Sequence, residues 1–155
     1  MSEFDRLFDE GEKKALLAHN KIEEIEHVFL QLNESFIRKT DNKKEIVKVL
    51  GEPRNPIAEI QDFTMGLNSI FNSKRRYVDE GLAENKIKKG SINIVSKTSN
   101  KSKVIALWEM DPNGYPFFIK YMGVKTSCRD KEALEAQLGQ IISSTAFWLV
   151  VHEMK

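Results

Sequence analysis

The fold is decided by the stretch Val104-Ile-Ala-Leu-Trp-Glu-Met-Asp-Pro-Asn-Gly-Tyr-Pro-Phe-Phe-Ile-Lys-Tyr-Met122. Two runs rich in aromatic and β-branched residues flank Asp111-Pro-Asn-Gly114. Pro112 pre-sets the φ angle of a turn, and Gly114 supplies the left-handed residue that closes the turn. The stretch therefore predicts a β-hairpin.

The pairing of the two strands determines what each face of this hairpin carries. Counting outward from the turn, we expect Trp108 to face Phe118 and Leu107 to face Ile119. Both faces are apolar in this register, so other elements should cover each side and the hairpin should lie in the middle of a sheet. Trp108 is accordingly expected to be buried in the core.

Length and composition favour one soluble domain. A chain of 155 residues can bury a sufficient core, so a single domain 1–155 is expected, with a helical part at about 1–72 and a sheet-plus-helix part at about 77–155. The 24 basic and 23 acidic side chains nearly cancel, which excludes a protein whose whole surface attracts polyanions.

Several features favour the cytoplasm. Cys128 is the only cysteine, so an internal disulfide and a cysteine-based zinc site are excluded and a reducing compartment fits best. The acidic N-terminus lacks the pattern of a signal peptide. The longest apolar run, 146–151, is far shorter than the roughly 20 residues that span a bilayer, so no membrane association is expected.

The N-terminal segment predicts a long helix at about 3–38. Its apolar residues follow one another at alternating spacings of four and three: Phe4, Phe8, Gly11, Ala15, Ala18, Ile22, Ile25, Phe29, Leu32 and Phe36. Such a helix is about 50 Å long, more than one small domain needs, so part of it should project or meet a second copy.

Two interpretations of this helix remain open. In the first, a coiled-coil-like dimer seam is formed by Ile22, Ile25, Phe29, Leu32 and Phe36. In the second, an ordinary amphipathic helix packs on its own domain.

Two further helices are expected in the helical part. Residues 45–50 end at Gly51 and predict a short helix, with a strand as the alternative. Asn55-Pro56 then offers an N-cap and a first helical position, and the apolar spacing beyond it predicts a helix at about 56–72.

The C-terminal part predicts an antiparallel sheet with a helix packed on it. Residues 92–97 are typical of a short strand beside the hairpin, and residues 123–128 of a fourth short strand or an extension of the third. Asp130 caps a helix, and the aromatic and β-branched residues in 146–153 favour a terminal strand over a helix. The expected class is α+β, with a mainly antiparallel sheet of three to five strands.

Positive charge is concentrated between residues 74 and 103. Only three acidic residues occur there, against nine basic ones: Lys74, Arg75, Arg76, Lys86, Lys88, Lys89, Lys97, Lys101 and Lys103. We expect these nine to form a binding surface for phosphates or for an acidic protein.

Catalytic motifs are scarce. The eight glycines form no nucleotide-binding loop, and the three histidines lack metal-ligand spacing, so neither cofactor nor metal is expected. Cys128 is followed by Arg129 and a helix start, both of which would lower a thiol pKa. A buried structural cysteine is the commoner role.

Three hypotheses for function follow. The first is a small non-catalytic cytoplasmic protein that binds a protein partner, of the immunity, inhibitor or adaptor type, with a homodimer through the N-terminal helix as an open option. The first alternative is a nucleic-acid-binding protein that uses the basic segment 74–103. The second alternative is a small enzyme built around Cys128.

Overall fold

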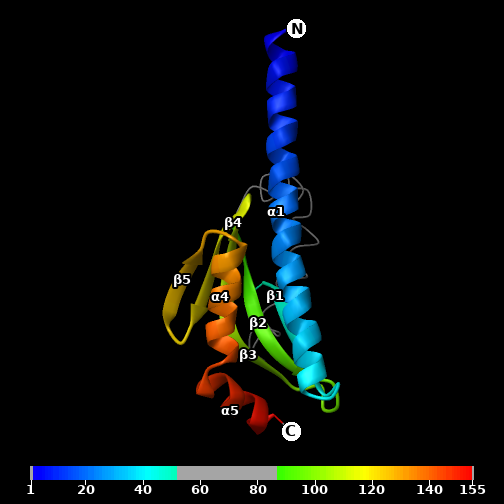
Figure 1. Ribbon diagram of the computed structural model, residues 1–155, viewed down its shortest axis with the longest axis vertical. Coiled ribbons are helices and arrows are strands. Elements are labelled where there is room, and N and C mark those ends of the chain that lie inside the picture. The colour runs from blue at the N-terminus through cyan, green and yellow to red at the C-terminus, as the bar shows by residue number, and fades with distance from the viewer. Residues whose placement is uncertain (1, 52–86, 155) are drawn as a thin grey trace, which may run out of the picture.

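The structure is a computed structural model, and it describes residues 2–51 and 87–154. These residues form an α+β fold with a long N-terminal helix, a five-stranded antiparallel sheet and two C-terminal helices (Figure 1). The elements run in the order α1 (Glu3–Lys39), β1 (Lys44–Leu50), β2 (Lys88–Ser96), β3 (Ser102–Asp111), β4 (Gly114–Tyr121), β5 (Val124–Cys128), α4 (Lys131–Ile142) and α5 (Thr145–Glu153). The strands lie in sequence order across the sheet.

Helix α1 confirms the predicted long N-terminal helix. Ser2 and Asp5 form a capping box that satisfies free backbone N–H groups at its start. At its end, Thr40 Oγ1 contacts the Phe36 carbonyl oxygen at 3.0 Å, and Asp41 and Asn42 take left-handed φ angles of 54° and 63°. This turn directs the chain from the helix into β1.

The core lies between the sheet and the helices, which pack on one face of the sheet (Figure 1). Phe29 of α1 meets Phe117 of β4 with ring centroids 5.7 Å apart, and Phe36 meets Phe147 of α5 at 5.7 Å. No helix among the described residues packs on the opposite face of β3 and β4. One face of the sheet is thus covered by the helices, and none of the described helices covers the other face of β3 and β4.

The predicted hairpin is β3 and β4, but the predicted register is wrong by one residue. Trp108 pairs with Ile119 and Glu109 pairs with Phe118, because an irregularity between Met110 and Asp111 shifts the pairing. The prediction of two apolar faces is therefore also wrong. Phe117 lies in the core beside Trp108, whereas Glu109 and Phe118 occupy the opposite face.

Trp108 is buried as predicted, with 2% of its surface exposed. Its indole Nε1 donates a hydrogen bond to the Val49 carbonyl oxygen at 3.1 Å, and its ring stacks on Phe117 at 5.7 Å and 11°. The ring crosses β2 at Gly90, where an added Cβ would lie 1.9 Å from the Val49 oxygen and 2.7 Å from the indole. Only glycine fits at that position.

The predicted helix at 45–50 is wrong, because this segment is strand β1. It pairs with β2 along its whole length, from Lys44 opposite Ser96 to Leu50 opposite Gly90. The backbone N–H of Ile46 also donates to Asn33 Oδ1 of α1 at 2.8 Å. These long-range hydrogen bonds outweigh the local spacing of apolar residues in deciding the conformation of this segment. The other predicted helix, 56–72, lies outside the described residues.

The predicted terminal strand at 146–153 is also wrong, because this segment is helix α5. Ser144 caps it by accepting a hydrogen bond from the Phe147 N–H at 3.2 Å, and Phe147 and Val151, four residues apart, are buried on one side. The predicted cap of α4 is confirmed, since Asp130 Oδ1 accepts from the Ala133 N–H at 2.8 Å.

In the two ranges that the structure describes, no helix is long and apolar enough to cross a membrane.

Candidate functional site

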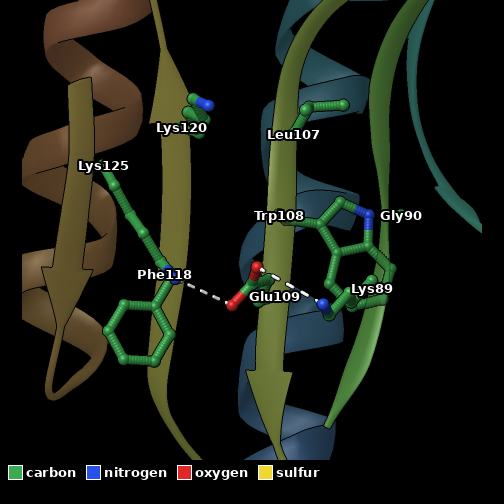
Figure 2. Close-up of a pocket in the computed structure, with 8 residues that line it drawn as sticks. All are labelled: Lys89, Gly90, Leu107, Trp108, Glu109, Phe118, Lys120 and Lys125. Atoms are coloured by element: carbon green, nitrogen blue, oxygen red, sulfur yellow. Dashed lines mark hydrogen bonds and ion pairs between the residues drawn. The ribbon is translucent and has the colours of Figure 1, made fainter. Parts of the chain in front are cut away.

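The candidate site is a hollow of about 330 Å³ on the sheet face opposite the helices (Figure 2). Gly90 and Trp108 lie at its floor, and Trp108 is too buried to offer contact area. We name the remaining lining residues the open surface: Lys89, Leu107, Glu109, Phe118, Lys120 and Lys125.

Strand pairing brings the open surface together from four strands. Lys89 of β2 pairs with Glu109 of β3, and Glu109 pairs in turn with Phe118 of β4. Lys120 of β4 pairs with Lys125 of β5. Paired residues on neighbouring strands project from the same face of a sheet, so the six side chains adjoin although they span 37 positions of the chain, from 89 to 125.

Glu109 is the electrostatic centre of the open surface. Its carboxylate lies 2.9 Å from Lys125 Nζ and 4.0 Å from Lys89 Nζ. The hydrogen bond from Lys125, helped by the charges of Lys89 and Lys120, lowers the pKa of the Glu109 carboxyl despite some burial. Glu109 is therefore ionised at neutral pH, and three ammonium groups against one carboxylate leave two net positive charges.

The open surface also carries apolar area. Leu107 is 39% exposed, and Phe118 is half-buried with Lys125 Nζ 4.8 Å from the centre of its ring. A cation above an aromatic face is attracted by the ring's quadrupole, which holds Lys125 between Phe118 and Glu109. An apolar side chain of a ligand could contact Leu107 and Phe118 while a carboxylate contacts a lysine.

The nine predicted basic binding residues do not form one surface among the described residues. Lys74, Arg75, Arg76 and Lys86 lie outside the described ranges.

The other five basic residues separate into two groups. Lys88 and Lys89 begin β2, and Lys89 belongs to the open surface. Lys97, Lys101 and Lys103 lie toward the opposite end. At roughly 3.3 Å per residue Lys97 is about 26 Å from Lys89, and Lys103, which pairs with Ile94, lies about 17 Å along β2 from it. Lys103 there pairs with Glu153 at 3.5 Å.

Sequence reasoning missed Glu109 and Lys125 as members of a site. Charge density along the chain points to 74–103, whereas these two residues are isolated charges inside apolar strands. The signal that could have found them is the alternation within each strand, which places Glu109 on the face opposite Trp108 and Lys125 on the face opposite buried Cys128.

The predicted dimer seam lies largely in the core of its own chain. Ile25, Phe29 and Phe36 are buried, and Ile22 and Leu32 are partly buried against the same core. Side chains that face their own sheet are not available to a second copy. Dimerisation itself stays a prediction.

Cys128 does not have the surroundings of a nucleophile. Its side chain is fully buried at the end of β5, and burial, with a smaller contribution from Asp130, raises the pKa of the thiol. The predicted lowering of this pKa is wrong because the Arg129 side chain is 90% exposed and lies 4.0 Å from Asp130 instead. No observation on the described residues supports an enzyme built around Cys128.

Within residues 2–51 and 87–154, no three His, Cys, Asp or Glu side chains gather in a way that could hold a metal ion. Comparison of the chain with family models, with curated proteins and with solved structures found no match.

Proposed function

We propose that this protein is a non-catalytic binding module, of the adaptor, immunity or inhibitor type, which holds a protein partner on the open surface. One observation carries the proposal: the sheet face opposite the helices has a hollow where partly exposed apolar side chains are surrounded by three lysines. Buried Cys128 is a free thiol, which suits a reducing compartment such as the cytoplasm.

The chemistry of the described lining favours binding over catalysis. It contains apolar side chains, lysines and a single carboxylate that is already paired with Lys125. Neither a hydroxyl or thiol nucleophile nor a histidine base is among these residues. We infer that the partner presents an apolar side chain to Leu107 and Phe118 and an acidic side chain to Lys120.

The placement of the described basic residues of the 74–103 segment favours a protein partner over nucleic acid. Lys88 and Lys89 begin β2, whereas Lys97, Lys101 and Lys103 lie toward its other end, so these residues do not form one continuous track for a phosphate backbone. Nucleic-acid binding by the 74–103 segment remains the alternative, and its test is the salt dependence of binding.

Charge reversal at Lys120 tests the proposal. Lys120 is exposed and occurs in none of the described ion pairs, so Lys120→Glu should change the open surface without unfolding the chain. The matched control is Lys97→Glu, an exposed lysine at the far end of β2. We expect a fluorescent peptide of alternating glutamate and leucine to bind about tenfold more weakly to Lys120→Glu and equally to Lys97→Glu.

A single-stranded oligothymidine is the competing probe. The proposal is wrong if the oligonucleotide binds more tightly than the peptide, loses affinity steeply with added salt and is released by Lys120→Glu. For the native partner, we expect proteins captured from cell extract by the wild type to be lost with Lys120→Glu and kept with Lys97→Glu.

A further inference from the structure

The N-terminal half of α1 extends beyond the sheet (Figure 1). The tip of the β3–β4 hairpin meets the helix at Lys21 and Ile22, where a Cβ added to Gly114 would lie 3.0 Å from Lys21 Cβ. We name residues 3–20 the free half of α1; at about 1.5 Å per residue it extends about 27 Å past this contact. All its residues are exposed except Ala18, which is partly buried.

The free half carries a stripe of large apolar side chains that are exposed to solvent. Phe4 is 73% exposed, Phe8 is 76% exposed and Leu7 is 47% exposed. The stripe continues through Gly11, Ala15 and Ala18 to the positions where α1 packs on the sheet. The same helix face is thus covered in one half of α1 and uncovered by described residues in the other.

The charges of this region are divided along the helix. Residues 3–12 contain five acidic residues and one arginine, a net charge of −4, whereas residues 13–21 contain three lysines and no acidic residue, a net charge of +3. Two copies aligned antiparallel would place each acidic part against a basic part. A parallel alignment would place like charges together, which is repulsive.

Side-chain size is divided in the same way. The bulky residues of the stripe, Phe4 and Phe8, lie in the acidic part, whereas Ala15 and Ala18 lie in the basic part. In the antiparallel register that places Gly11 against Ala15 of the second copy, Phe8 faces Ala18. Phe8 then meets a small side chain, which lets the two helices approach closely there, and Phe4 faces Ile22, which is partly buried just beyond the free half.

We propose that the free half of α1 pairs antiparallel with the same segment of a second copy, giving a homodimer with the two sheets at opposite ends. An aromatic side chain buries about 150–250 Å². At three quarters exposure, Phe4 and Phe8 together provide about 225–375 Å² per copy, against about 800 Å² per partner in a standard stable interface. The dimer should therefore dissociate on dilution. This pairing is independent of the open surface.

Sedimentation equilibrium of the full chain tests the pairing. We expect the wild type to shift from monomer to dimer as concentration rises, and Phe8→Glu to stay monomeric. The matched control is Leu16→Glu, which places the same charge at a 60% exposed leucine off the stripe and should leave the dimer intact. Equal circular dichroism of the two variants would show that both fold.

The direction of pairing is tested by the distance between two spin labels at Glu3→Cys. In the proposed register residue 3 lies beside residue 23 of the second copy, so the labels should be about 30 Å apart along the axis. A parallel pair would hold them about 10 Å apart. A wild type that stays monomeric at every concentration, equal loss of the dimer in both glutamate variants, or the short distance would each overturn the proposal.

Discussion

Replacing Trp108 by alanine should remove a large share of the stability of the fold. The ring is 2% exposed and stacks on Phe117, so its loss opens a cavity where the helices meet the sheet. Such truncations cost about 3–5 kcal/mol. The Val49 carbonyl also loses its indole donor, at 3.1 Å. A domain of this size is stable by about 5–15 kcal/mol in total, so Trp108→Ala should unfold at much lower urea concentration.

The neighbouring residue provides the control. Leu107 precedes Trp108 on β3 but lies on the opposite face and is 39% exposed, so Leu107→Ala should cost only about 1 kcal/mol. Urea unfolding followed by far-ultraviolet circular dichroism would measure both changes, with unchanged slopes confirming that the same transition is compared. If the free energy of unfolding fell no more for Trp108→Ala than for Leu107→Ala, Trp108 would not be a central part of the core.

Three further predictions follow from particular contacts. Gly90→Ala should destabilise the fold by about 1–3 kcal/mol or more because the added Cβ has no room. Gly139→Ala, in helix α4, should stabilise the fold by up to about 1 kcal/mol because its added Cβ meets no other atom within 4 Å; thermal unfolding would compare the two variants. Burial and the hydrogen bond to Glu24 raise the pKa of Tyr115, so the contribution of this residue to stability is complete below about pH 10 and is lost as pH rises further. In urea titrations, the free energy of unfolding of Tyr115→Phe should therefore fall less steeply between about pH 10 and pH 12 than that of the wild type. Cys128 of the native chain should react with iodoacetamide at least about a hundredfold more slowly than free cysteine at mildly alkaline pH, and a rate near that of the free thiol would contradict its burial and raised pKa.

Local sequence chemistry predicted where elements begin and turn. The long helix, the hairpin turn at Asp111–Gly114 and the cap at Asp130 depend on residues within a few positions of one another. The hairpin register depends on an irregularity next to Met110, which no local pattern specifies. Because the observed register differs from the predicted one by one residue, Phe117 and Phe118 exchange faces of the sheet relative to the prediction.

Errors arose where distant contacts decide the conformation. Strand β1 pairs with residues 40 to 52 positions further along the chain, so the spacing inside 45–50 could not identify it. The aromatic and β-branched residues in 146–153 favour a strand by local propensity, whereas this segment is a helix capped by Ser144 and packed through Phe147 and Val151. The open surface follows from the combined register of β2, β3, β4 and β5, which explains why a count of charges along the chain did not find it.

Lysine footprinting would measure whether a protein partner covers the open surface in the cell. A lysine-acylating reagent would be applied to the purified chain and to the cells that make it, and modification at each lysine would be quantified by mass spectrometry. We predict that Lys120, exposed in the isolated chain, is modified more slowly in cells, whereas exposed Lys97 and Lys101 are modified equally in both. Unchanged reactivity at Lys120 together with protection of Lys97 and Lys101 would show that the open surface is not covered in cells and would place the interaction at the other end of the sheet.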